Sequence, residues 1–189
     1  MRNRLNKKGD IWVSTVIYIA LSIVVLTIVL LAALPLIQKL KDRNVTVQTK
    51  NILFQMDKNI REVVSSGPGA TRVLSPVIID AGVLNFDTAG STIKWTLKTS
   101  DAFAEPGILK QEGSVYTIVN ERIVGGAVIE GEYEISQYLT YNVTPNVQMI
   151  FSQNSLRPPF TGRFTMRVKN IGTAIIENQP IPKLEFDIQ

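Results

Sequence analysis

A run of 27 residues without Asp, Glu, Lys, Arg or His occupies positions 11–37 of this 189-residue chain. As an α-helix this run would be about 40 Å long, against about 30 Å of hydrocarbon in a bilayer. The apolar part of a secretory signal is only about 7–15 residues long. The run therefore predicts a helix that crosses a membrane once, with some tilt.

A cluster of four basic residues, Arg2, Arg4, Lys7 and Lys8, precedes the apolar run. Positive charge beside a membrane segment holds that end of the chain in the cytoplasm. Without residues 1–9 the chain has 16 basic and 16 acidic residues, because four of its 20 basic and none of its 16 acidic residues lie there. Since this cluster adjoins an apolar segment and not a folded face, we interpret it as a topology signal and expect no nucleic-acid partner.

The chain contains neither cysteine nor histidine. It therefore lacks the commonest general base, a thiol nucleophile and the usual zinc ligands. We expect no catalytic residues, no metal and no cofactor. Three carboxylates, Glu130, Glu132 and Glu134, alternate along a predicted strand. A divalent cation there is one interpretation, and a solvated strand face is the one we favour.

Apolar residues continue at helical spacing beyond the uncharged run. They are Val45, Thr49, Ile52, Leu53, Met56, Ile60 and Val63, with charged residues on the other faces. An amphipathic helix is therefore expected to reach about Ser65, where the sequence Ser-Ser-Gly-Pro-Gly at 65–69 ends it. We expect Pro35 to kink the helix near the membrane surface, because proline removes one backbone hydrogen bond.

The remainder of the chain has the alternating pattern of antiparallel strands separated by turn residues, as a sheet or a sandwich requires. The predicted strands are 72–79, 83–87, 91–99, 114–120, 126–136, 146–153, 162–170 and 183–189. In the clearest cases Ile93, Trp95 and Leu97 share one face, and so do Phe164, Met166 and Val168. The predicted class is α+β, a long N-terminal helix followed by an antiparallel β-rich, sandwich-like head.

The junction Lys7-Lys8-Gly9-Asp10-Ile11 resembles the processing site of archaeal type IV prepilins, the class III signal peptide. The long helix before a β-rich head resembles the same family, and the segment 167–174 (RVKNIGTA) is similar to one in archaellin and archaeal pilin heads. The resemblance implies that a prepilin peptidase cuts between Gly9 and Asp10. Ser14 stands at the fifth position after that cut, where bacterial members carry glutamate, so registration of subunits by that carboxylate is not implied.

The resemblance implies three parts: residues 1–9, which are removed; a helix over 10–66, apolar at 10–37 and amphipathic at 38–66; and a head over 70–189. It also implies a structural subunit of an extracellular archaeal pilus-like filament, with a possible adhesive role. Such a subunit lies in the cell membrane with its N-terminus in the cytoplasm, and later polymerises through its N-terminal helix. The implied partners are other copies of the chain, the prepilin peptidase, an assembly ATPase and a membrane platform.

Two other classes fit parts of the sequence. A single-pass, membrane-anchored extracytoplasmic binding protein is the main alternative, although a head of about 120 residues is small for one. An anchored enzyme is disfavoured by the lack of histidine and cysteine.

Two N-glycosylation sequons occur, at Asn44-Val45-Thr46 and Asn142-Val143-Thr144. Because the head would be exported, Asn142 is the better candidate. Asn44 follows the apolar run by only seven residues.

Overall fold

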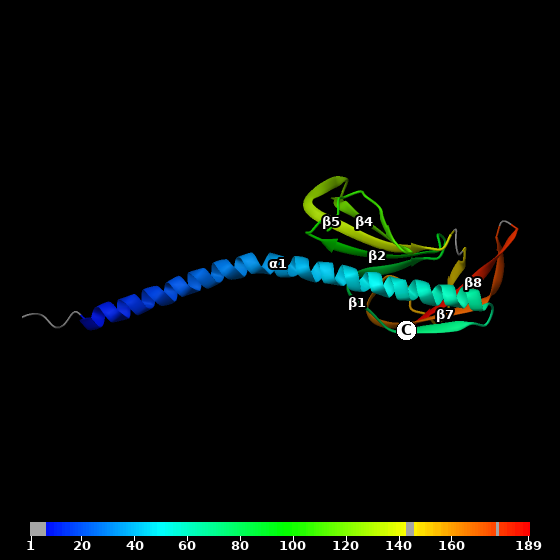
Figure 1. The fold of residues 1–189 in the computed structure, drawn as a ribbon, viewed down its shortest axis with the longest axis horizontal. Helices are drawn as coiled ribbons and strands as arrows, with labels where there is room; N and C mark the ends of the chain where they lie inside the picture. Colours follow the sequence, from blue (N-terminus) through cyan, green and yellow to red (C-terminus); the bar gives the residue numbers. More distant parts are fainter. Residues whose placement is uncertain (1–6, 143–145, 177) are drawn as a thin grey trace, which may run out of the picture. The chain divides into compact units, whose positions relative to one another are not determined.

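The structure, a computed structural model, describes residues 7–142, 146–176 and 178–189 (Figure 1). It contains one long helix, α1 (Lys7–Ser66), followed by strands. The strands are β1 (Thr71–Asp87), β2 (Thr92–Thr99), β3 (Lys110–Glu112), β4 (Val115–Val124), β5 (Ala127–Thr140), β6 (Gln148–Phe151), β7 (Phe160–Ile176) and β8 (Gln179–Ile188). The predicted α+β class is confirmed. The chain divides into two compact units, Met1–Lys41 and Asp42–Gln189.

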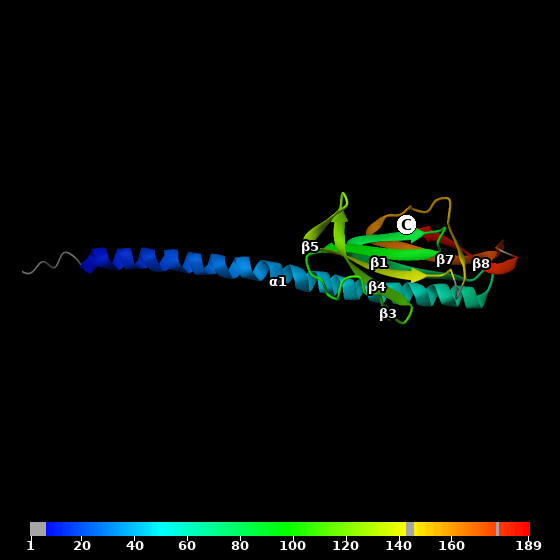
Figure 2. The ribbon, with the colours of Figure 1, turned by 90° about the horizontal axis from the view of Figure 1, so that it is seen from above.

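Figure 2 shows the strands of the second unit from above. The described strands form one curled sheet in the order β3-β4-β5-β2-β1-β7-β8-β6. Neighbouring strands are antiparallel, except for β6, which runs parallel to β8. The strand pattern in the sequence fitted either a single sheet or a sandwich of two sheets. The strands of the second unit form a single sheet. We call this second unit, Asp42–Gln189, the head.

The strand β1 joins two segments that the sequence predicted as separate strands, 72–79 and 83–87. The residues between them form an irregularity in the pairing of β1 with β7, and the chain does not reverse there. Gly82 has a φ of 79°, and a Cβ atom at this position would lie 2.4 Å from the Thr96 carbonyl oxygen. Gly82, which lies between the two predicted strands, therefore permits a bulge with close backbone contact.

The buried faces of β2 and β7 are those that the alternating sequence pattern predicted. Ile93, Trp95 and Leu97 are buried on one face of β2, and Phe164, Met166 and Val168 are buried on one face of β7. The turn between β1 and β2 is held by Asp87, whose Oδ1 accepts hydrogen bonds from the backbone N–H groups of Ala89 (3.0 Å) and Gly90 (3.1 Å). An aspartate at such a position mimics a backbone turn.

Residues 42–66 of α1 cover the inner face of the sheet. The predicted apolar stripe is buried in one core with the strands: Val45, Thr49, Leu53, Met56, Ile60 and Val63 are buried, and Ile52 is partly buried. The spacing of three and four residues places these side chains on one helix face. The apolar face of residues 42–66 is therefore covered by the sheet of the same unit.

Candidate functional site: the exposed apolar segment of α1

The apolar run behaves differently from the stripe that comes after it. Over residues 14–37, the large side chains are exposed, from 51% for Leu30 to 69% for Tyr18. The most apolar stretch of 18 residues has a mean hydropathy of 2.9, and none of it is buried within the chain. By length and composition this helix can cross a membrane. An apolar surface of this size requires a bilayer or a packing partner.

Two polar side chains inside the run bond to their own helix. The Ser22 hydroxyl donates to the Tyr18 carbonyl oxygen at 2.8 Å, and the Thr27 hydroxyl donates to the Ile23 carbonyl oxygen at 2.8 Å. Such bonds satisfy hydroxyl groups that lie in an apolar medium. Both residues therefore fit a lipid environment as small side chains without an unsatisfied donor.

The predicted processing junction lies in the first turns of α1. The backbone of Lys7, Lys8, Gly9, Asp10 and Ile11 is helical. The side chains of these residues, and Arg2 and Arg4 altogether, lie outside the described part of the chain. The cut between Gly9 and Asp10 stays a prediction.

Pro35 lies inside α1, which is assigned as helix on both sides of it. Proline at this place cannot donate to the carbonyl four residues earlier. The kink at Pro35 stays a prediction.

The two sequons lie in different surroundings. Asn44 is exposed but helical, and the Thr46 hydroxyl donates to the Asp42 carbonyl oxygen at 2.8 Å. Asn142 is exposed in the segment after β5, where its Oδ1 accepts a hydrogen bond from the Thr140 hydroxyl at 2.8 Å. A surface loop is the usual place of a glycosylated asparagine. Asn142 therefore stays the better candidate, with Val143 and Thr144 outside the described residues.

A buried polar cluster at Asp57, in the middle of the apolar stripe, joins α1 to the residue that follows β5. Its carboxylate accepts hydrogen bonds from the Tyr141 hydroxyl (2.9 Å) and from Arg61 Nε (2.9 and 3.0 Å). Tyr141 is fully buried, and burial together with the Asp57 carboxylate raises the pKa of Tyr141 far above its ordinary value. The phenol therefore stays protonated and donates to Asp57 over the physiological pH range.

Sequence reasoning did not find this cluster. The one signal was that Asp57 stands four residues after Leu53 and three before Ile60, and so lies on the apolar face. A charged residue at such a position needs a partner, because an unpaired buried charge is costly. Tyr141 is 84 positions away in the chain, so only the fold identifies it.

Replacing Tyr141 with phenylalanine is expected to lower the free energy of unfolding of the head by about 1–3 kcal/mol, because Asp57 loses a buried donor. The raised pKa stabilises the folded head below pH 10, the ordinary tyrosine value, and this contribution is lost as the pH rises above it. The variant should therefore lose less stability between pH 9 and 11 than the unchanged chain. Denaturant titrations at several pH values measure both effects. The half-buried Tyr138 provides the control, since its phenylalanine variant should change stability by no more than about 0.5 kcal/mol.

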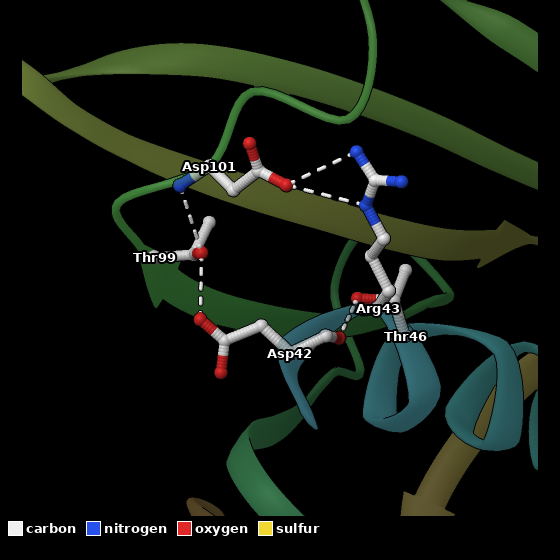
Figure 3. Close-up of polar contacts among 5 residues, drawn as sticks. All are labelled: Asp42, Arg43, Thr46, Thr99 and Asp101. Atoms are coloured by element: carbon white, nitrogen blue, oxygen red, sulfur yellow. Dashed lines mark hydrogen bonds and ion pairs between the residues drawn. The ribbon is translucent and has the colours of Figure 1, made fainter. Parts of the chain in front are cut away.

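A second polar cluster lies where the helix enters the head (Figure 3). The Thr99 hydroxyl, at the end of β2, donates to the Asp42 carboxylate at 2.7 Å and accepts the Asp101 backbone N–H at 3.1 Å. Arg43 forms an ion pair with Asp101 at 3.2 Å, and its guanidinium lies 5.3 Å from the centre of the Phe103 ring. These contacts attach the first turn of residues 42–66 to the end of β2.

The C-terminal end of α1 is capped from β7. Asn170, which is buried, donates from Nδ2 to the carbonyl oxygen of Val63 at 3.4 Å, and its Oδ1 accepts the Gly172 backbone N–H at 3.0 Å. The last carbonyl groups of a helix lack partners within the helix. The Asn-Ile-Gly segment of the sequence therefore has a structural role here, as a bulge that presents an amide to the helix end.

The three alternating carboxylates are not equivalent. Glu132 forms an ion pair with Arg122 across the β4–β5 pair. Gly131, between Glu130 and Glu132, has a φ of 77°, which interrupts the regular alternation of the strand. Among the described residues, no group of three or more acidic side chains has the arrangement of a metal site.

Comparison of the chain with protein-family models, with curated protein sequences and with solved structures gives no match. The structure therefore defines a class by architecture alone: a long N-terminal helix with an exposed apolar segment, followed by a β-sheet head. This architecture is pilin-like.

Proposed function

We propose that the chain is a structural subunit of an extracellular, archaeal type IV pilus-like filament, held in the membrane before assembly and polymerised through the apolar segment of α1. The observation that carries the proposal is the contrast within one helix. Residues 42–66 bury their apolar face against the sheet, whereas residues 14–37 expose large apolar side chains all round. Residues 14–37 therefore need a partner that the described chain does not contain.

The physical chemistry of such a segment suits transfer between two apolar settings. Lipid tails are about as apolar as leucine, so a move from bilayer to helix bundle changes the hydrophobic free energy little. Exposure to water would instead cost about 1.5–3 kcal/mol for each large aliphatic side chain. We therefore propose that a membrane platform and an assembly ATPase move the helix directly from lipid into the filament.

A helical polymer forms when one heterologous contact repeats without closing into a ring. In the proposed filament the apolar helices form the core and the heads form the outer surface. The balanced charge of the chain without residues 1–9, 16 basic and 16 acidic residues, favours dense packing of like subunits. The role proposed here is structural and not catalytic.

Electron microscopy of material sheared from the cell surface tests the proposal. We expect filaments whose subunits, by mass spectrometry, begin at Asp10. A chain that stays in the membrane fraction after shearing, with no filaments, would instead favour the membrane-anchored binding protein.

Replacing Gly9 with phenylalanine is expected to stop processing, because the peptidase must fit the residue before the cut. The precursor should accumulate at its uncut mass, and filaments should be lost. Mass spectrometry of membrane fractions measures the first effect and microscopy the second. Asn6→Gln is the control, since this change keeps the charge and lies outside the Lys7–Ile11 junction. A Gly9→Phe chain that still yields subunits starting at Asp10 would contradict the proposed processing.

A further inference from the structure

The hairpin between β4 and β5 ends in an uncharged stretch of seven residues, Ile-Val-Gly-Gly-Ala-Val-Ile at 123–129. Gly125 and Gly126 have φ values of 62° and 86°, and Val124 pairs with Ala127 across them. Two positive φ angles are what the favoured two-residue hairpin turn requires. The turn places apolar side chains at an exposed tip: Ile123 is 64%, Val124 50% and Val128 55% exposed.

Charged residues surround the base of this tip and are absent from the seven residues of the tip itself. Arg122 and Glu132 form an ion pair across the two strands, and Glu121 and Glu130 are exposed beside them. Apolar side chains that project beyond a polar base can be buried at the boundary between lipid headgroups and acyl chains, with a binding strength that scales with the apolar area buried. Three large aliphatic side chains that are exposed together at one tip form the kind of apolar patch that marks an interaction site.

The tip lies at a defined end of the head. Tyr141, the residue directly after β5, donates a hydrogen bond to Asp57 of α1. Nearer the start of β5, Tyr133 pairs with Thr99 of β2, and Thr99 donates a hydrogen bond to Asp42 of α1. The strand thus runs along the helix from position 57 back to position 42. Its remaining residues continue past Tyr133 to the turn with β4, where Val128 pairs with Ile123. The hairpin tip therefore belongs to the Asp42 end of the head.

Chain length places this end of the head close to the membrane. Asp42 comes five residues after Ile37, the last residue of the apolar run. Even a fully extended chain of five residues spans at most about 18 Å. If the run crosses the bilayer, the Asp42 end of the head therefore stays near the lipid surface, whatever the arrangement of the two units.

We infer that the β4–β5 hairpin is a second membrane contact, which inserts Ile123, Val124 and Val128 into the lipid interface before the subunit is assembled. The inference rests on the proposed function, because it requires α1 to be anchored in the same bilayer. With two contacts, the helix and the hairpin, the head is held in one orientation on the membrane. Extraction of the subunit then has to release the hairpin together with the helix.

The chain has no cysteine, so single cysteines can be introduced and labelled without background. Full-length variants Val124→Cys, Ile175→Cys and Leu26→Cys would carry an environment-sensitive fluorophore in phosphatidylcholine vesicles, with and without nitroxide on the lipid acyl chains. Ile175 is the matched control: it lies on the β7–β8 hairpin, beyond the contact of Asn170 with Val63 at the other end of the head, and is 79% exposed. Leu26 reports on the anchor.

We expect blue-shifted emission and nitroxide quenching at positions 26 and 124, and neither at 175. Quenching at 26 with a water-like signal at 124 would overturn the hairpin contact and leave the anchor intact. A blue shift at 124 without quenching would place the tip in an apolar site outside the lipid and would also overturn the inference. An unquenched signal at 26 would overturn the anchor, and the proposed function and this inference with it.

Discussion

Replacing Leu26 with arginine is expected to abolish filaments while leaving much of the chain in the membrane. An arginine at the centre of a membrane helix costs about 3–4 kcal/mol relative to leucine. The run 11–37 contains 17 isoleucine, leucine and valine residues, which together favour insertion by about 5–10 kcal/mol. One charge therefore weakens the anchor without cancelling it, because the arginine can also reach the interface with its long side chain.

The proposed filament core tolerates the same charge far less. In a bundle of helices the arginine of every copy would be buried at the same depth, without a carboxylate partner, since residues 11–37 contain no acidic side chain. An uncompensated buried charge typically costs about 3–5 kcal/mol, and the cost recurs with every subunit added. Assembly should therefore fail although insertion succeeds.

Membrane fractionation and electron microscopy of sheared material separate these two effects. Leu26→Ile is the control, because it keeps volume and polarity and should leave both insertion and filaments unchanged. Normal filaments from the arginine variant would show that the apolar segment is not the polymer core. Loss of the variant from the membrane would show that the anchor is weaker than its composition indicates.

Replacing Leu53 with alanine is expected to lower the free energy of unfolding of the head by about 2–5 kcal/mol, because Leu53 is fully buried between α1 and the sheet. For a unit of this size each kcal/mol corresponds to about 2–4 °C, so the midpoint of thermal unfolding should fall by about 4–20 °C. Calorimetry or circular dichroism of the full chain in detergent measures the change.

Val47 provides the control for Leu53, because it lies on the same part of α1 and is 51% exposed. Val47→Ala should change stability by no more than about 0.5 kcal/mol. Equal losses in the two variants would mean that residues 42–66 are not packed on the sheet as described. Val47→Ala also offers a test of packing between subunits, since any effect on filaments would then not be due to folding.

Much of this architecture can be predicted from the sequence because its periodicities are strong. The uncharged run indicates a membrane helix by length alone, and the spacing from Val45 to Val63 identifies the face that is buried. The alternation in β2 and β7 likewise identifies their buried faces. In each case the pattern is local, and the covalent geometry of helix or strand converts it directly into a surface.

The sequence-based predictions were wrong or undecided where one local sequence signal is compatible with two structures. Glycine at position 82 permits a turn or a bulge, and only the pairing of β1 with both β2 and β7 selects the bulge. The strand β3 is three residues long, too short to carry a period. The strand pattern did not choose between one sheet and two.

The sequence by itself determined that the chain has one long helix with two kinds of apolar surface, followed by antiparallel strands, because hydrophobic period and the absence of charge depend only on neighbouring residues. The tertiary structure decided which distant groups meet: Asp57 with Tyr141, Asn170 with the end of α1, and Thr99 with Asp42. The physical reason is that these contacts join residues far apart in the chain. Strand order and register fix them, and no short-range pattern encodes either.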